Sequence, residues 1–176
     1  NEKVWAEAVI KLMEILLRDK PQALRSFVKD NYEIFKQNDD VWASTGHALF
    51  AVKEYKKAKE WFADWRKRKK VESWMLWNFA LVLRLLGENI ESNHISREAL
   101  NLKSDNTVNL HLMMLGLDEI FAENYAEAEK FYAQINQQAL SDWDRFFYFL
   151  VENNLEIYRQ AANGQIEEAQ ELTKIM

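Results

Sequence analysis

The sequence predicts an all-α protein built from helix pairs that stack side by side, and three observations support this prediction. Its 176 residues include only four glycines and one proline, too few for the frequent tight turns of a strand-rich protein. Apolar residues recur at helical spacing in each segment. A helix–turn–helix unit also recurs at about 34 residues. Because one amphipathic pair cannot bury its own apolar face, neighbouring pairs must stack.

Five helix pairs follow from this periodicity. We expect them at residues 2–18 with 21–36, 40–53 with 55–69, 71–86 with 88–101, 106–122 with 125–138, and 141–162 with 165–175. Pro21 suits the first turn of a helix, where a missing N–H has no cost. Asp39 or Asp40 is the expected N-cap of the third helix, and Ser141 with Asp144 forms a capping-box pattern.

The pairs are expected to form a single domain over residues 1–176, with units of about 2–36, 40–69, 71–101, 106–138 and 141–175. The chain begins at Asn1 and ends within a helical pattern, so we interpret it as a fragment of a longer protein. No apolar run approaches the roughly 20 residues that span a bilayer, and no signal segment opens the chain. Since cysteine is also absent, we expect a cytoplasmic protein.

Four positions of the repeated unit carry related residues. They are a small residue in the first helix, an aromatic or apolar residue after the turn, a small residue in the second helix, and a large core residue. The equivalent sets are Gly46, Tyr55, Ala58 and Phe62; Ala80, Asn89, Ser92 and Ser96; and Gly116, Tyr125, Ala128 and Tyr132. The middle set is a degenerate copy, although it retains a glycine, Gly87, at the expected turn between its helices.

This pattern resembles the tetratricopeptide repeat (TPR) family. The resemblance implies a right-handed superhelical solenoid of about five antiparallel helix pairs, whose first helices line a concave groove that binds peptides or proteins. In this register the groove residues are His47, Phe50, Trp74, Trp77, Leu81, Arg84, Met113, Leu117, Phe121 and Tyr158. Such an apolar, aromatic surface suits an apolar or amphipathic segment of a partner. The alternative is that several of these residues belong to the core between helices.

Charge is distributed unevenly along the chain. The net charge is −5, yet residues 41–70 carry nine basic and three acidic side chains, whereas residues 107–176 carry four and twelve. This balance argues against a general nucleic-acid binder. The basic run Arg66, Lys67, Arg68, Lys69 and Lys70 is a candidate contact patch for an acidic partner. The alternative is a solvated helix end, where cations complement the helix dipole.

No sequence motif of catalysis is present. The chain has no nucleophile elbow, no glycine-rich phosphate loop and no H-E-x-x-H pattern, and the His94–Glu98 pair lacks a third metal ligand. We therefore expect no enzyme and no cofactor, but a non-catalytic protein–protein interaction module. Two alternatives stay open: a regulatory or structural solenoid attached to a catalytic domain of the same parent protein, and a secretion-type chaperone.

Overall fold

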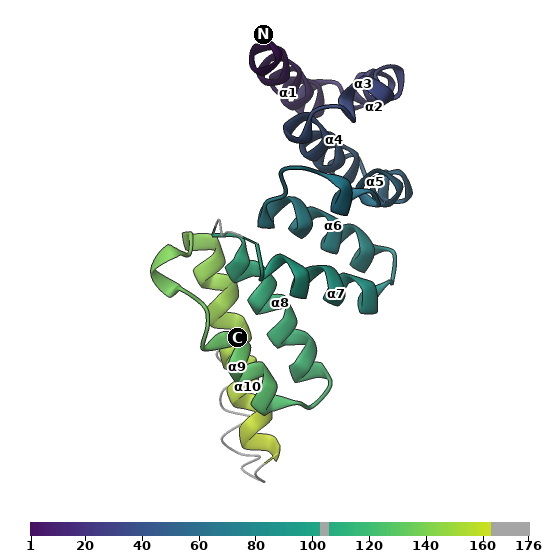
Figure 1. Ribbon diagram of the computed structural model, residues 1–176. Helices are drawn as coiled ribbons and strands as arrows, with labels where there is room; N and C mark the ends of the chain where they lie inside the picture. Colours follow the sequence, from purple (N-terminus) through teal and green to yellow (C-terminus); the bar gives the residue numbers. More distant parts are fainter. Residues whose placement is uncertain (103–105, 163–176) are drawn as a thin grey trace. The chain divides into compact units, whose positions relative to one another are not determined.

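The computed structural model describes residues 1–102 and 106–162 of the chain (Figure 1). These residues form ten α-helices and two short 3-10 helices without a strand, which confirms the predicted all-α class. The chain groups into two compact units, Asn1–Glu98 and Ala99–Met176, where the sequence predicted a single domain. The helix predicted at 165–175 lies outside the described residues. None of the described helices has the length and apolarity needed to cross a bilayer.

The first unit contains three successive helix pairs. Its elements are α1 Glu2–Asp19, α2 Pro21–Asp30, α3 Tyr32–Phe35, α4 Asp39–Ala51, α5 Tyr55–Phe62, the 3-10 helix η1 Trp65–Lys67, α6 Ser73–Leu85 and α7 Asn89–Ala99. The first helices pack in sequence, α1 on α4 and α4 on α6, while α2 packs on α1 and α5 on α4 (Figure 1). The first helices α1, α4 and α6 therefore form a continuous layer.

Two helix starts in this unit can be compared with the sequence predictions; one is confirmed and one is corrected. Pro21 opens α2 as predicted. The N-cap of α4 is Asn38 rather than Asp39 or Asp40, because the Asn38 side chain accepts hydrogen bonds from the backbone N–H groups of Asp40 and Val41, both at 3.1 Å. Asp39 and Asp40 lie in the first turn instead, where their charge favours the positive end of the helix dipole.

The turn between paired helices has the same geometry in three places. Lys53, Gly87 and Glu123 all adopt positive φ angles, of 64°, 80° and 62°. The N–H of the next residue then donates to the carbonyl five residues earlier, at 2.9 Å for Glu54, 2.9 Å for Glu88 and 2.8 Å for Asn124. This is the Schellman arrangement that ends a helix. The recurrence in the sequence thus corresponds to a recurring turn.

Small residues also lie where the helices of a pair approach closely. A Cβ added to Gly46 would come within 2.7 Å of three atoms of the Phe62 ring, and one on Gly116 within 3.0 Å of three atoms of Tyr132. Ala58 and Ala128, in the second helices, are fully buried. These helices can approach so closely because the positions predicted to be small carry little or no side chain.

The core of the first unit is rich in tryptophan. Trp42 and Trp61 are fully buried, and each indole N–H donates to the other residue's backbone carbonyl, at 3.2 Å and 2.8 Å. The Phe62 ring lies edge-on to Trp42 at 5.4 Å and stacks on Phe79 of α6 at 5.5 Å. These contacts connect the second helix pair to the third.

The second unit contains α8 Val108–Phe121, α9 Tyr125–Tyr132, the 3-10 helix η2 Gln137–Ala139 and α10 Asp142–Ala162. Helices α8 and α9 pack together, and α10 packs on both. Ser141 caps α10, since its hydroxyl accepts from the Asp144 N–H at 3.2 Å and donates to the Asp144 carboxylate at 2.6 Å. The predicted pairing of Ser141 with Asp144 is confirmed.

Candidate peptide-binding surface

Two adjoining hollows lie along the layer of first helices in the first unit. One, of about 590 Å³, is lined by Asn1, Glu2, Lys3, Ala6, Glu7, Ile10, Asn38, Asp40, Ser44 and Trp74. The other, of about 280 Å³, is lined by Ile10, Met13, Glu14, Leu17, Arg18, Ser44, His47, Ala48 and Trp74. Both share Ile10 of α1, Ser44 of α4 and Trp74 of α6. Together they make one surface, which we call the first-helix groove.

One end of the first-helix groove is mainly apolar. Met13, Leu17 and Ala48 join the shared Ile10 and Trp74 there. The Trp74 indole is half-buried and its N–H donates to the Glu72 carboxylate at 2.7 Å, which fixes the orientation of the ring. A fixed aromatic wall beside aliphatic side chains suits an apolar side chain of a partner.

The other end of the groove is acidic. Glu2, Glu7 and Asp40 line it together with one basic side chain, Lys3. Intramolecular contacts satisfy part of this charge, since Glu2 accepts from Asn38 at 3.0 Å and Asp40 pairs with a lysine at 2.8 Å. Glu7 and Asp40 remain largely exposed. Lys3 pairs with Glu7 at 3.9 Å and Lys70 pairs with Asp40, so one carboxylate is in excess, and this excess favours a cationic group at this end.

The structure places only part of the predicted groove residues of the first unit on this surface. His47 and Trp74 line it, and the His47 Nδ1 lies 3.3 Å from the Asn78 side-chain oxygen. Three further predicted residues, Phe50, Trp77 and Leu81, are half-buried and line neither hollow.

Arg84, also predicted for the groove, points to the second helix of its pair. Its guanidinium donates to the Asn93 side chain of α7 at 3.0 Å. Of the groove residues predicted on α4 and α6, only His47 and Trp74 line the first-helix groove, one on each helix.

In the second unit, the groove assignment of Met113 is wrong. Met113 is 0% exposed and belongs to the hydrophobic core, because α9 and α10 both pack against α8. Leu117 is half-buried against the same core. Phe121 and Tyr158 are exposed, and Tyr158 stacks on Tyr125 at 6.2 Å.

The basic run was predicted to end a long α-helix, but Arg66 and Lys67 instead form the last turn of the short 3-10 helix η1. Helix α5 stops at Phe62, and Arg68 has an extended backbone. The Arg68 side chain is only 9% exposed, pairs with Asp64, donates to the Lys36 carbonyl and lies 4.8 Å above the Trp42 ring. These tertiary contacts hold Arg68 in its extended conformation, so that α5 does not continue through the basic run.

The other members of the run divide into two groups. Lys70 pairs with Asp40 at 2.8 Å and Glu72 at 3.2 Å, and these carboxylates raise its pKa. Arg66 pairs with Glu98, the expected partner of His94. Lys67 and Lys69 are exposed. Only these two lysines keep the character of a solvated basic patch.

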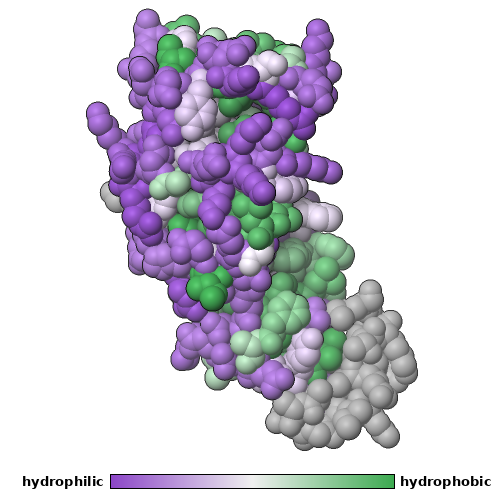
Figure 2. Space-filling model, turned by 90° about the vertical axis from the view of Figure 1, so that its right-hand side faces the viewer, coloured by the Kyte–Doolittle hydropathy of each residue, from purple (hydrophilic) through white to green (hydrophobic). Residues whose placement is uncertain are grey.

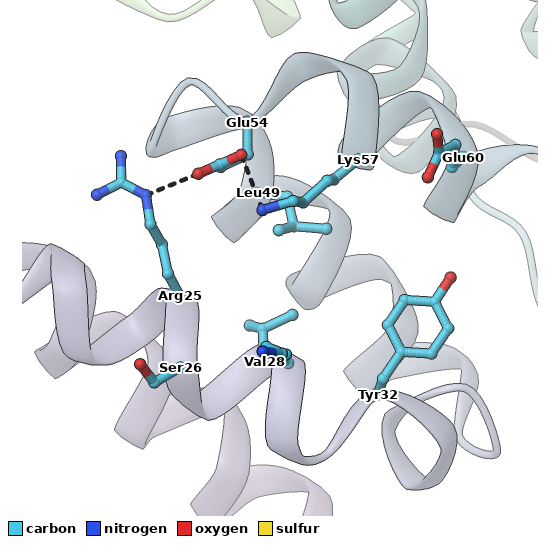
Figure 3. Close-up of a pocket in the computed structure, with 9 residues that line it drawn as sticks. Arg25, Ser26, Val28, Tyr32, Leu49, Glu54, Lys57 and Glu60 are labelled. Atoms are coloured by element: carbon cyan, nitrogen blue, oxygen red, sulfur yellow. Dashed lines mark hydrogen bonds and ion pairs between the residues drawn. The ribbon is translucent and has the colours of Figure 1, made fainter.

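A second cleft in the first unit was not predicted from the sequence. It has a volume of about 540 Å³ and is lined by Arg25, Ser26, Val28, Lys29, Tyr32, Leu49, Glu54, Lys57 and Glu60 (Figure 3). It lies between α2–α3 and α5, so we call it the second-helix cleft. A sequence signal was present in the lysines of residues 53–59. The cleft also needs Arg25 of α2, which pairs with Glu54 across a separation of 29 residues.

An exposed aromatic stripe lies on α10. Trp143, Phe146 and Phe149, spaced by three residues, are 75%, 53% and 50% exposed. Residues at this spacing share one helix face. Helix α10 therefore carries an exposed apolar face within the described residues.

A scan against protein-family models and searches of curated proteins and of solved structures found no match. Within residues 1–102 and 106–162, no group of three His, Asp or Glu side chains comes together in a way that could hold a metal ion. The His94–Glu98 pair, at 3.0 Å, has the Arg66 guanidinium beside it. A cation therefore already occupies the position that a metal would need.

Proposed function

We propose that the chain is a non-catalytic, TPR-like interaction module whose first-helix groove binds a segment of another protein. The observation that carries the proposal is the continuity of the groove over three successive first helices, through Ile10, Ser44 and Trp74. The recurring turns at Lys53, Gly87 and Glu123 support the likeness to helical repeats. A solenoid arrangement of the five pairs is part of this proposal.

The apolar end of the groove supplies most of the affinity. Removing apolar surface from water contributes about 25 cal/mol per Å². A leucine or phenylalanine side chain that buries roughly 100–150 Å² between Met13, Leu17 and Trp74 then contributes about 2.5–4 kcal/mol before ordering costs. One well-seated anchor can therefore dominate binding.

The acidic end defines where the partner carries positive charge. Glu7 and Met13 are six residues apart on α1, which is about 9 Å along the helix axis. An extended peptide covers this distance in about three residues. The proposed ligand is thus a segment with an apolar anchor and a lysine or arginine about three positions away.

A displayed library of random twelve-residue peptides, selected on the immobilised chain, tests the proposal. Enriched peptides should share this spacing of anchor and basic residue. Ser44→Trp, which fills the shared centre of the groove, should weaken the binding of synthetic copies at least tenfold. Ala126→Trp, an exposed position on α9, is the matched control and should leave it unchanged. A selection without enrichment, or binding insensitive to Ser44→Trp, would refute the proposal.

The aromatic stripe on α10 supports a second candidate function, that of a solenoid attached to another domain of a longer protein. Trp143, Phe146 and Phe149 would be the face that contacts such a domain. In a longer protein containing this chain, Phe146→Asp should then increase proteolytic cleavage near α10, whereas in the chain alone it should not. Equal cleavage rates in both contexts would exclude this function.

A further inference from the structure

We infer that the second-helix cleft is a separate recognition site for an acidic peptide segment with an aliphatic anchor. It lies on α2, α3 and α5, so it is distinct from the first-helix groove. The inference does not depend on the function proposed for that groove.

The cleft has a preformed apolar floor. Val28 of α2 and Leu49 of α4 are 3% and 5% exposed, and Figure 3 shows them between a wall with Arg25, Glu54 and Lys57 and a wall with Tyr32 and Glu60. The Tyr32 ring is held edge-on against Trp61 at 4.8 Å. A floor of this kind accommodates an aliphatic side chain without rearrangement.

One wall of the cleft carries fixed positive charge. The Glu54 carboxylate accepts from Arg25 at 2.9 Å and pairs with Lys57 at 3.1 Å (Figure 3). Arg25 also donates to the Val52 carbonyl at 2.9 Å, which anchors its guanidinium. Two cations share one anion, so this trio has a net charge of +1, and the remaining charged residues of the lining, Lys29 and Glu60, offset each other.

The surrounding face has the same sign. Residues 20–36 carry four basic and two acidic side chains, and residues 52–62 again four and two, which gives a net charge of +4. The first helices α1, α4 and α6 together carry four basic and six acidic side chains, a net charge of −2. Figure 2 shows the face with α3 and α5 as mainly hydrophilic, with apolar patches between polar side chains. This face therefore attracts acidic partners.

The lining carries charges of both signs, which favours a peptide over a nucleic acid as the ligand. Glu54 and Glu60 lie in the cleft with the three cations, and they would repel a continuous row of phosphates. A peptide can place its carboxylates beside Arg25 and Lys57 and its aliphatic side chain over Val28 and Leu49. The chemistry thus favours spaced acidic residues around an apolar centre.

NMR titration of the whole chain with a defined probe tests the inference. The probe is an acetylated decapeptide in which two glutamates alternate with two serines on each side of two central leucines. Amide shifts should concentrate on α2, α3 and α5. Replacing the two leucines by alanine should weaken binding about fivefold.

Two matched double variants separate the cleft from general charge effects. Lys29→Gln with Lys57→Gln should weaken probe binding at least tenfold. Lys67→Gln with Lys69→Gln removes the same charge from exposed positions elsewhere. This variant should change the affinity for the probe less than twofold. Ser44→Trp should have no effect on probe binding. A negative result for the second-helix cleft is therefore distinguishable from a negative result for the first-helix groove.

Several results would overturn the inference. These are no saturable binding of the probe, equal losses in the two double variants, equal binding of the alanine peptide, or shifts centred on α1, α4 and α6. Equal or tighter binding of a single-stranded dodecathymidylate at the same residues would show that the cleft binds nucleic acid rather than an acidic peptide.

Discussion

Gly46→Ala should destabilise the first unit even though alanine is the better helix former. The new Cβ would come within 2.7 Å of three atoms of the Phe62 ring. That ring is fully buried and held between Trp42 and Phe79 at 5.4 and 5.5 Å. Because neither neighbour can move without disturbing the core, the clash is relieved only by separating α4 from α5.

The expected magnitude follows from two opposed effects. Overpacking costs about 1–3 kcal/mol, and a Cβ only 2.2 Å from the Phe62 ring places this substitution at about 2–3 kcal/mol. Replacing glycine by alanine inside a helix gains about 1 kcal/mol. The net loss is about 1–2 kcal/mol, which lowers the melting temperature by about 5–10 °C for a unit of this size. In a Phe62→Leu background the clash disappears, so Gly46→Ala should then stabilise the unit by up to about 1 kcal/mol.

Thermal unfolding followed by tryptophan fluorescence measures this effect in the correct unit, since six of the seven tryptophans, all except Trp143, lie in Asn1–Glu98. Ser44→Ala, two residues away on α4, is the control and should stay within about 0.5 kcal/mol of the parent chain. If Gly46→Ala were neutral or stabilising in the parent chain, the close packing of α4 on α5 would be refuted.

Three other substitutions test separate parts of the structure. Arg68→Ala should cost about 3 kcal/mol in an unfolding titration, because it leaves the partly buried Asp64 carboxylate without its cation, whereas Lys69→Ala should be neutral; equal effects would contradict this. Lys53→Gly should raise the free energy of unfolding by about 1 kcal/mol, since glycine adopts the positive φ of 64° without strain; a loss of stability would contradict the turn geometry. Neighbouring Lys57 and Arg25 lower the pKa of Glu54 in the folded chain below its ordinary value of 4.5. The ionised Glu54 therefore contributes up to about 1 kcal/mol to the free energy of unfolding. This contribution is fully present above pH 4.5 and is lost as pH falls through the lower folded pKa. The difference in melting temperature between the parent chain and Glu54→Gln should shrink from pH 7 to pH 3, and a constant difference would exclude the ion pair.

The helix pairs could be predicted because their signals are local. Apolar periodicity and Pro21 depend on neighbours within a turn or two, and the small residues at 46, 58, 116 and 128 recur at equivalent positions of the repeated unit. Helix α5 was predicted too long for the opposite reason. Residues 63–70 favour a helix by composition, but Trp65 is buried and Arg68 binds the Lys36 carbonyl, and such long-range contacts override helix propensity.

The groove was predicted only in part, because apolar periodicity does not show which face of a helix is buried when the helix is apolar nearly all round. Helix α8 is such a helix, so Met113 could be assigned to the groove or to the core with equal justification from the sequence. The structure buries it because α9 and α10 cover two sides of α8. The second-helix cleft depends on the pairing of Arg25 with Glu54, 29 residues away, and no local pattern encodes that pairing.

Locating a bound peptide on the chain tests directly whether the first-helix groove binds a partner segment. A peptide enriched from the displayed library is synthesised with photo-leucine at its apolar anchor, irradiated with the parent chain and digested for mass spectrometry. We expect crosslinks to residues of the first-helix groove, above all Ile10, Met13, Leu17 and Trp74. Crosslinks confined to the second-helix cleft or to the aromatic stripe on α10 would contradict it.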